Sequence, residues 1–151
     1  MIDAQIAGIS GDMILSSLVN LGANKSRIIE GIYTAESFLD NSKITNIDFI
    51  SVQKNGKDAT QLILEIDENV HERKATDIKY CIVESAKKIG LSESGLNFAT
   101  NAINTLISAE SKVHGESESS VHFHEAASID TVVDILAVSY THLTLPTNRE
   151  V

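Results

Sequence analysis

His122 and His124 are the residues of this sequence whose type and spacing point most directly to chemistry. They alternate with Val121 and Phe123, and such alternation of apolar and polar residues is typical of a short strand. Side chains two positions apart on a strand point to the same face, about 7 Å apart. Both imidazoles could therefore bind one metal ion from the same side. The structural alternative is simply the polar end of a strand.

The helix predicted after this strand carries two aspartates, Asp130 and Asp134, four residues apart. Helical geometry places both carboxylates on one face. Glu125 joins the same site only if the strand ends at His124; otherwise its carboxylate orients an imidazole. Asp130 could also cap the N-terminus of its helix, and the two roles can coexist. Imidazoles with carboxylates suit nickel, zinc, iron or manganese, so we predict a metal site that includes His122, His124, Glu125, Asp130 and Asp134.

A second candidate site, for a substrate or its phosphate, lies between a strand predicted at residues 2–6 and a predicted helix. Its residues are Asp3, Gly8, Ser10, Gly11 and Asp12. Backbone N–H groups at such a turn, together with the helix dipole, favour an anion. The P-loop lysine is absent, and a tight strand-to-helix turn explains the glycines equally well. Asp3 and Asp12 could instead offer carboxylates to the same metal or substrate.

His114 stands before Gly115 at the expected end of a long helix. An imidazole there interacts favourably with the helix dipole, and glycine commonly ends a helix. Its closeness to His122 in the sequence leaves a second interpretation, in which His114 supports a metal ligand from outside the coordination sphere. No Ser-His-Asp or Cys-His arrangement follows from the spacing, so we assign no catalytic residue.

Composition limits the classes of partner. The 151 residues carry a formal net charge of −9, which argues against nucleic acid and anionic membranes, because both attract clusters of Lys and Arg. The single cysteine, Cys81, excludes an internal disulfide or a cysteine-based zinc site, and its helical position predicts a buried thiol. No apolar run approaches the ~20 residues of a membrane span, and no signal peptide is visible. We expect a soluble, cytoplasmic protein of about one domain.

The periodicity predicts an α/β fold. A short N-terminal strand precedes two helices, and Asn55-Gly56 between β-type residues predicts a hairpin. From Thr76 the helical period returns for two more helices, followed by the histidine strand and its helix. We expect a mixed sheet with amphipathic helices packed on it, since each helix is apolar on one face only. The strand order does not follow from the sequence.

The final residues, 139–151, lack the apolar period of the helix that begins near Asp130. We expect that helix to stop after about two turns, which is unusual for a core helix. Residues 1–138 are therefore predicted to be a truncated N-terminal domain, and 139–151 a tail foreign to it. His142 lies in this tail and is left out of the site.

The motifs together resemble those of the nickel insertion protein family. The likeness covers residues 1–138 and rests on Gly8–Met13 (GISGDM), Val113-His114-Gly115, Val121–Glu125 (VHFHE), Asp130 and Val133-Asp134. One departure is Ala126-Ala127, where the family usually carries Val-Gly. If position 127 requires a positive φ, alanine would be strained there.

The resemblance implies a function that spacing alone does not. Family members are chelatases of the lyase class that insert nickel into a pyridinium bisthiocarboxylic acid mononucleotide, completing the nickel-pincer nucleotide of lactate racemase and related enzymes. The reaction consumes CTP, with manganese or magnesium, at a site associated with a C-terminal domain that this chain lacks. The resemblance places the metal-facing ligands opposite Asp3, Ser10 and Asp12.

It also implies that the pincer-nucleotide precursor is a partner, that lactate racemase or a related apo-enzyme is a further one, and that the intact protein is a homo-oligomer. The residues alone leave two alternatives open. One is a metal-dependent phosphoester hydrolase with the same ligands, and the other is a non-catalytic scaffold domain.

Overall fold

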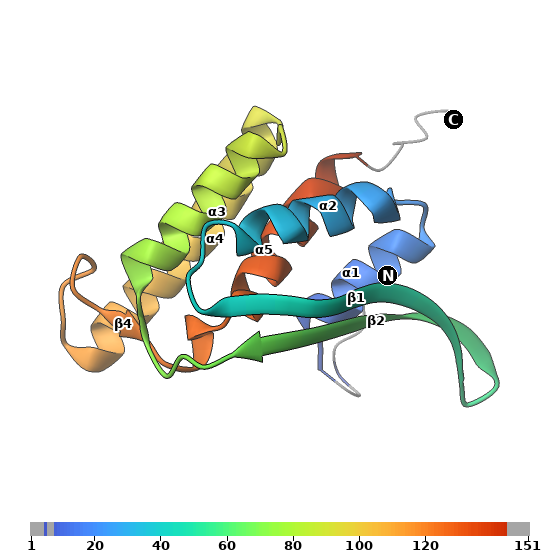
Figure 1. Ribbon diagram of the computed structural model, residues 1–151, viewed down its shortest axis with the longest axis horizontal. Coiled ribbons are helices and arrows are strands. Elements are labelled where there is room, and N and C mark those ends of the chain that lie inside the picture. The colour runs from blue at the N-terminus through green and yellow to red at the C-terminus, as the bar shows by residue number, and fades with distance from the viewer. Residues whose placement is uncertain (1–4, 6–7, 145–151) are drawn as a thin grey trace.

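The computed structural model describes Gln5 and residues 8–144 of the chain (Figure 1). The helices are α1 (Gly11–Asn20), α2 (Lys25–Glu36), α3 (Ala75–Lys88), α4 (Glu93–His114) and α5 (Ile129–Thr144), with a 3₁₀ helix η1 (Glu125–Ala127). The strands are β1 (Ser42–Lys54), β2 (Lys57–Glu68), β3 (Arg73–Lys74) and β4 (His122–Phe123). This mixture confirms the α/β fold class. The strand predicted at residues 2–6 lies outside the described residues, apart from Gln5.

β1 and β2 form one long antiparallel hairpin whose tip extends beyond the helices (Figure 1). Lys54 pairs with Lys57 across the turn Asn55-Gly56, whose φ angles are 52° and 74°. Positive φ at both central positions is what a type I′ turn requires, so the predicted hairpin is confirmed. Its inner face is buried against α1 and α2. The buried residues on that face are Ile44, Ile47, Phe49 and Leu62.

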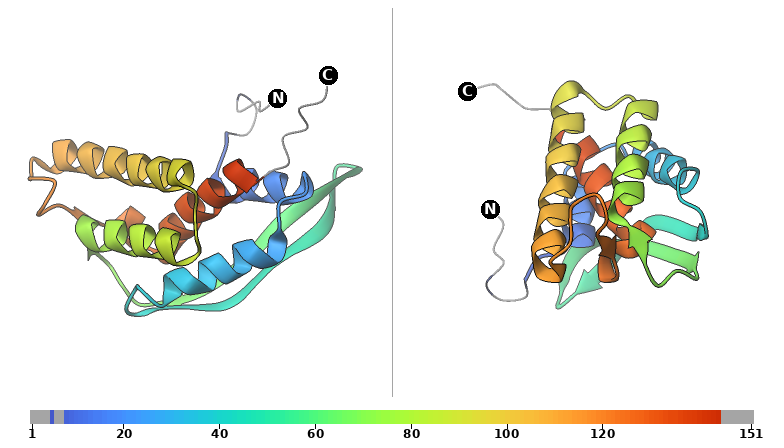
Figure 2. Two further views of the ribbon diagram at one scale, coloured as in Figure 1. Left: turned by 90° about the horizontal axis from the view of Figure 1, so that it is seen from above. Right: turned by 90° about the vertical axis from the view of Figure 1, so that its left-hand side faces the viewer.

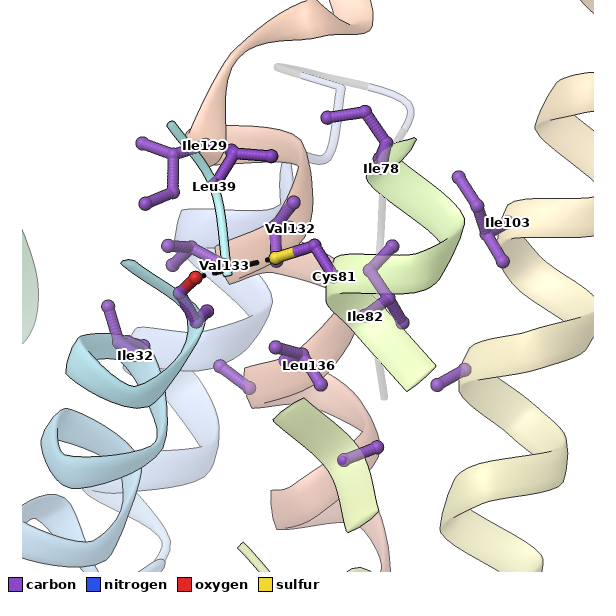
Figure 3. Packing of buried hydrophobic residues seen from close by; sticks show 14 of the residues in the cluster. Ile32, Leu39, Ile78, Cys81, Ile82, Ile103, Ile129, Val132, Val133 and Leu136 are labelled. Atoms are coloured by element: carbon purple, nitrogen blue, oxygen red, sulfur yellow. Dashed lines mark hydrogen bonds between the residues drawn. The ribbon is translucent and has the colours of Figure 1, made fainter. Parts of the chain in front are cut away.

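α5 is the helix around which the others pack, and it contacts α1, α2, α3 and α4 (Figure 2). Its predicted apolar positions are all buried: Ile129, Val132, Val133, Leu136 and Ala137. Figure 3 shows several of these side chains meeting residues of α2, α3 and α4 in one core. Burying each large aliphatic side chain contributes about 1.5–3 kcal/mol, so α5 fixes the relative positions of the helices.

Cys81 lies in this core with none of its surface exposed. Its thiol donates to the Ala35 carbonyl at 3.4 Å, which links α3 to α2 (Figure 3). Burial raises the pKa of Cys81 to about 11, so the thiol stays protonated and packs as a small apolar group. The prediction of a buried thiol is confirmed.

α5 continues further than the sequence suggested. It runs for 16 residues to Thr144, so the expectation that it stops after about two turns is wrong. Ser139 is fully buried, and its hydroxyl donates to the Ile135 carbonyl one turn earlier. That hydrogen bond satisfies the serine hydroxyl within the helix, so Ser139 can lie in the core without an unpaired polar group. The assignment of residues 1–138 and 139–151 to a domain and a foreign tail stays a prediction.

β4 pairs antiparallel with β3, with Lys74 opposite His122 and Arg73 opposite Phe123. Among the described residues the strands therefore form two separate two-stranded sheets, β1-β2 and β3-β4. Phe123 and Val121 are buried and anchor the histidine segment on the core. None of the helices in the described part of the chain is long and apolar enough to cross a bilayer.

Candidate functional site

Asp12 occupies the first turn of α1 and is held by two local hydrogen bonds. The Ser10 hydroxyl donates to its Oδ1, and the Met13 backbone N–H donates to the same oxygen at 2.9 Å. Ser10 has the extended backbone of an N-cap, but its side chain makes no capping bond. Its hydroxyl instead fixes the carboxylate of Asp12, and Gly8 gives the preceding turn its positive φ of 72°.

Asp134 on α5 lies directly against the start of α1. A β-carbon added at Gly11 would lie 2.0 Å from Cγ of Asp134 and within 2.2 Å of both its oxygens. Atoms cannot approach so closely, so only glycine permits this approach of α5 to α1. The second glycine of the GISGDM motif is thus explained by the carboxylate it admits. This brings the start of α1, with Gly11 and Asp12, next to Asp134, whereas the role predicted for these residues in binding stays a prediction.

Two carboxyl groups of α5, those of Asp130 and Asp134, have raised pKa values. Burial, followed by the negative charges of Asp130 and Asp12, raises the pKa of Asp134 to about 6. Partial removal from water, followed by the charges of Asp12 and Glu68, also raises the pKa of Asp130. Within residues 8–144, no Lys or Arg forms an ion pair with Asp12, Asp130 or Asp134. We call these three residues the acidic cluster; such a cluster favours a proton or a cation.

Ser128, not Asp130, caps α5. The helix begins at Ile129, and the Ser128 side chain accepts from the Asp130 backbone N–H at 3.2 Å. Asp130 is therefore in the first turn, where its charge is favourable for the helix dipole. The interpretation of Asp130 as the N-cap is wrong by two residues, because Ser128 offers the shorter oxygen-bearing side chain at the extended position before the helix.

The two histidines of the VHFHE motif have different neighbours. The strand ends at Phe123, and His124 has a helical-region backbone with φ −106° and ψ −71°. The alternation that would place both rings on one strand face therefore does not extend to His124. His122 lines an open hollow of about 520 Å³ together with Lys74, Asp77 and Tyr80.

His124 is exposed and faces His114, with ring centroids 5.6 Å apart. Glu125 begins η1 and is exposed. Among Gln5 and residues 8–140, no three His, Cys, Asp or Glu side chains are placed to hold one metal ion. The expected convergence of both imidazoles and the carboxylates on one point is therefore not found there. Asp3, the remaining candidate, lies outside the described residues.

Comparison with known proteins decides the family. The sequence model of the family described as "Nickel insertion protein" matches residues 1–149. The chain belongs to this family. A relative from Staphylococcus saprophyticus, named pyridinium-3,5-bisthiocarboxylic acid mononucleotide nickel insertion protein, is 35% identical over 130 residues, which are 86% of this chain and 31% of the relative.

Two further relatives are named putative nickel insertion proteins. One from Methanothermobacter thermautotrophicus is 28% identical over 99% of this chain and 35% of its own length. Another, from Syntrophotalea carbinolica, is 33% identical over 88% of this chain and 32% of its own length. The chain thus spans about a third of the length of these relatives. No solved structure matches the chain.

The family motifs occupy defined places in the fold. Gly8–Met13 forms the turn into α1, and Val121–Glu125 forms β4 and the start of η1. The departure at Ala126-Ala127 causes no backbone strain, because Asn41 and Asn55 are the only described residues other than glycine with positive φ. Ala127 ends η1 and is buried, and the strain considered for it does not occur.

Sequence reasoning missed the residues that position α5, Glu68 and Arg73. Arg73 donates to Glu68 Oε1 at 2.7 Å and to the Ala127 carbonyl at 2.6 Å. It also donates to the Asp40 carbonyl and to the Ser42 hydroxyl. Glu68 in turn accepts from the Ile129 backbone N–H at 3.2 Å, at the first residue of α5. These contacts tie the end of β2 to the helix that carries Asp130 and Asp134.

Burial acts to raise the pKa of Glu68, but hydrogen bonds from Arg73, Ser128, Ser42 and the Ile129 backbone together lower it. Glu68 is therefore a carboxylate kept charged by its partners. The sequence offers one signal for the pair: two opposite charges, five residues apart, flank a short loop at the end of an alternating strand. That signal does not reveal burial, since exposed loops carry the same residues.

Proposed function

We propose that this chain is the metal-handling part of a protein that inserts nickel into pyridinium bisthiocarboxylic acid mononucleotide. The observation that carries the proposal is the 35% identity, over 86% of the chain, to a relative named for that insertion. The activity is that of a chelatase of the lyase class. Its CTP, with manganese or magnesium, binds in the part of the family protein that this chain does not span.

The donor atoms of the chain suit this task. Imidazole nitrogens and carboxylate oxygens bind nickel, and the single cysteine is buried and protonated, so no thiolate competes. A site without thiolates releases its metal more readily than a cysteine cage does. The thiocarboxylate sulfurs of the precursor then displace the protein ligands one by one. We assign His122, His124, Glu125, Asp130 and Asp134 to the path of the nickel ion.

The turn Gly8–Asp12 and the acidic cluster take the nucleotide end of the precursor in this proposal. A phosphate there meets the backbone N–H groups and dipole of α1, which attract it. It also meets Asp12, Asp130 and Asp134, which repel it. A divalent cation between phosphate and carboxylates removes the repulsion, which makes the acidic cluster part of the substrate site together with Asp3, Gly8, Ser10 and Gly11.

Transfer of nickel tests the proposal directly. The chain is loaded with nickel chloride, freed of unbound metal by gel filtration and mixed with the precursor. We expect the nickel to leave the protein fraction and a nickel–sulfur charge-transfer band to appear. A chain that binds no nickel, or that keeps all of it in the presence of the precursor, would contradict the function. The His122→Ala/His124→Ala variant is expected to carry less nickel into the reaction.

The acidic cluster favours one second candidate, a metal-dependent phosphoester hydrolase. One or two carboxylates of this cluster, together with the phosphoester and water, could hold magnesium or manganese, which would activate a water molecule. Turnover of p-nitrophenyl phosphate that stops on addition of a chelator would support this alternative. No turnover with either metal would remove it.

We further propose a cytoplasmic protein that forms a homo-oligomer when intact and supplies the finished cofactor to lactate racemase or a related apo-enzyme. A non-catalytic role for this part of the protein is the opposing hypothesis. It predicts that the His122→Ala/His124→Ala change leaves insertion by the full-length protein unaffected.

A further inference from the structure

His114 and His124 come from different elements and meet at the surface. His114 is the last residue of α4, and His124 follows β4. Their ring centroids are 5.6 Å apart, with the ring planes inclined at 56°. The two rings are not a stacked pair, because stacked rings lie parallel. Their edges are free to turn toward a common point.

The segment between them is held in place by its own hydrogen bonds. Gly115 ends α4 in the left-handed conformation with φ 68°, and the Glu116 N–H donates to Ser111 O at 3.1 Å. Val121 donates to Ser117 and accepts from the Ala75 N–H, both at 3.0 Å. These bonds fix the backbone between the two residues, so the two rings lie within reach of each other before any ligand arrives.

Each ring has a carboxylate near one of its nitrogens. Nε2 of His114 lies 3.2 Å from Glu110 Oε2, within hydrogen-bond distance, whereas Nδ1 of His124 lies 3.9 Å from Glu72 Oε2, an ion-pair distance that would shorten if the ring turned. This leaves Nδ1 of His114 and Nε2 of His124 for another partner. A carboxylate at one imidazole nitrogen and a metal at the other is the usual arrangement around metal-binding histidines, because the carboxylate fixes the tautomer and the orientation.

The ring separation fits a shared metal ion. With a metal–nitrogen bond of about 2.1 Å, each ring centroid lies about 3.25 Å from the ion. Two such rings are then about 4.6 Å apart at a 90° ligand angle and about 6.5 Å apart at 180°. The observed 5.6 Å lies inside this range. Rotation of the two side chains is enough to bring both nitrogens to one ion, with no change in the backbone.

We propose that His114 and His124 form a two-imidazole surface site that takes up nickel and releases it again. This inference rests on the proposed function and adds the place at which nickel first binds to the protein. Water completes the coordination, since no third His, Cys, Asp or Glu among the described residues is placed to join one metal ion. The four side chains, of Glu72, Glu110, His114 and His124, are 31–61% exposed, so the ion can enter and leave. Two neutral nitrogens bind nickel more weakly than a closed cage, which suits a site that passes its metal on.

Nickel titration of the whole chain by calorimetry tests the site, with nickel chloride as the probe. His114→Ala and His124→Ala are each expected to lower the affinity at least tenfold, and the double variant no further than the stronger single one. Either single change removes chelation, so the effects do not add. Glu110→Gln keeps the shape but weakens the hold on His114, and a smaller loss is expected. His71→Ala is the matched control, because His71 is exposed and lies outside the pair.

A thermal melt without metal shows that each variant is folded, as expected for exposed positions. Broadening of the His114 and His124 ring signals by paramagnetic nickel, in NMR spectra of the unmodified chain, gives a second readout. The inference is overturned if the His114 and His124 variants bind nickel like the unmodified chain, or if His71→Ala loses as much affinity. Transfer of nickel to the precursor that survives such a result would leave the proposed function standing without this entry site.

Discussion

Glu68 and the acidic cluster both lie near the first turns of α5, but their carboxylates have different surroundings. Glu68 has a guanidinium, two hydroxyls and a backbone N–H as partners, and its pKa is lowered. In the acidic cluster, burial and neighbouring negative charges raise the pKa of Asp130 and Asp134. A buried charge with all its partners serves structure, whereas like charges without a described counter-charge destabilise the fold. The difference separates the part of α5 that is anchored from the part that is left to bind something.

The largest effect on stability is expected for Arg73→Met, which removes the positive partner of Glu68. The side chains of Arg73 and Glu68 are only 9% and 12% exposed, so the change leaves Glu68 charged and buried without its positive partner. Removing one member of such a pair destabilises a fold by about 3–5 kcal/mol. Urea unfolding followed by circular dichroism measures the loss.

Arg27→Met is the matched control, because the Arg27–Glu30 pair is 59% and 69% exposed. An exposed pair contributes about 0.5 kcal/mol or less. Equal losses for the two variants would contradict the structural role of Glu68 and Arg73. In that case a structural role would no longer distinguish Glu68 from the acidic cluster.

A medium effect is expected from Gly11→Ala, which forces the two sides of the acidic cluster apart. The new methyl group would meet the Asp134 carboxylate at 2.0 Å, and overpacking of this kind costs about 1–3 kcal/mol. The carboxylate can turn away from the methyl group, so displacement of Asp134 rather than global unfolding is the expected response. Thermal or urea unfolding measures the effect.

The companion variant is Gly11→Ala/Asp134→Ala. If the methyl group acts through the carboxylate, the double change destabilises less than the sum of the single changes. Strict additivity would mean that Gly11 matters for another reason, such as the geometry of the turn before α1.

The two groups also differ in how far the sequence reveals them. The spacing of Asp130 and Asp134 was sufficient to predict that both lie on one helix, because local periodicity decides which helix face a side chain occupies; their role in a site stays a prediction. The hairpin at Asn55-Gly56, the apolar positions of α5 and the burial of Cys81 were predictable for the same reason.

Other features depend on contacts between distant segments. Arg73 reaches Ala127, 54 residues away, and no local pattern encodes that bond. The pairing of β3 with β4 likewise joins segments almost 50 residues apart, and it ends β4 before His124. The prediction that His122 and His124 share a strand face is therefore wrong, because the strand ends between them. The contacts of His124 with His114 and Glu72 emerge only from the fold, although the sequence had already suggested a supporting role for His114.

Asp134→Asn is expected to have the smallest effect on the free energy of unfolding, and it should stabilise the chain rather than destabilise it. The pKa of Asp134 in the folded chain is about 6, above the ordinary value of 3.8. A carboxyl group with a raised pKa binds its proton more tightly in the folded state, so its contribution to stability falls as pH rises from about 4 to about 6. Above pH 6 the folded chain holds a charge it disfavours, and asparagine removes that charge. After allowance for solvent screening of a half-buried group, we expect a gain of about 1–2 kcal/mol at pH 7.5.

The gain should shrink as the pH falls from 6 to 4, where Asp134 is protonated in the folded chain, and should vanish only below about pH 3, where it is protonated in both states. Urea unfolding at pH 7.5, 6 and 4 measures this trend, and Asp67→Asn on the hairpin is an exposed control. A divalent cation should reduce the advantage of the variant at pH 7.5, because an ion bound at the acidic cluster stabilises the unmodified chain but not the variant. If Asp134→Asn destabilises the chain at pH 7.5 without metal, the acidic cluster is compensated after all. It would then belong with Glu68 among the structural groups rather than with the residues that bind a ligand.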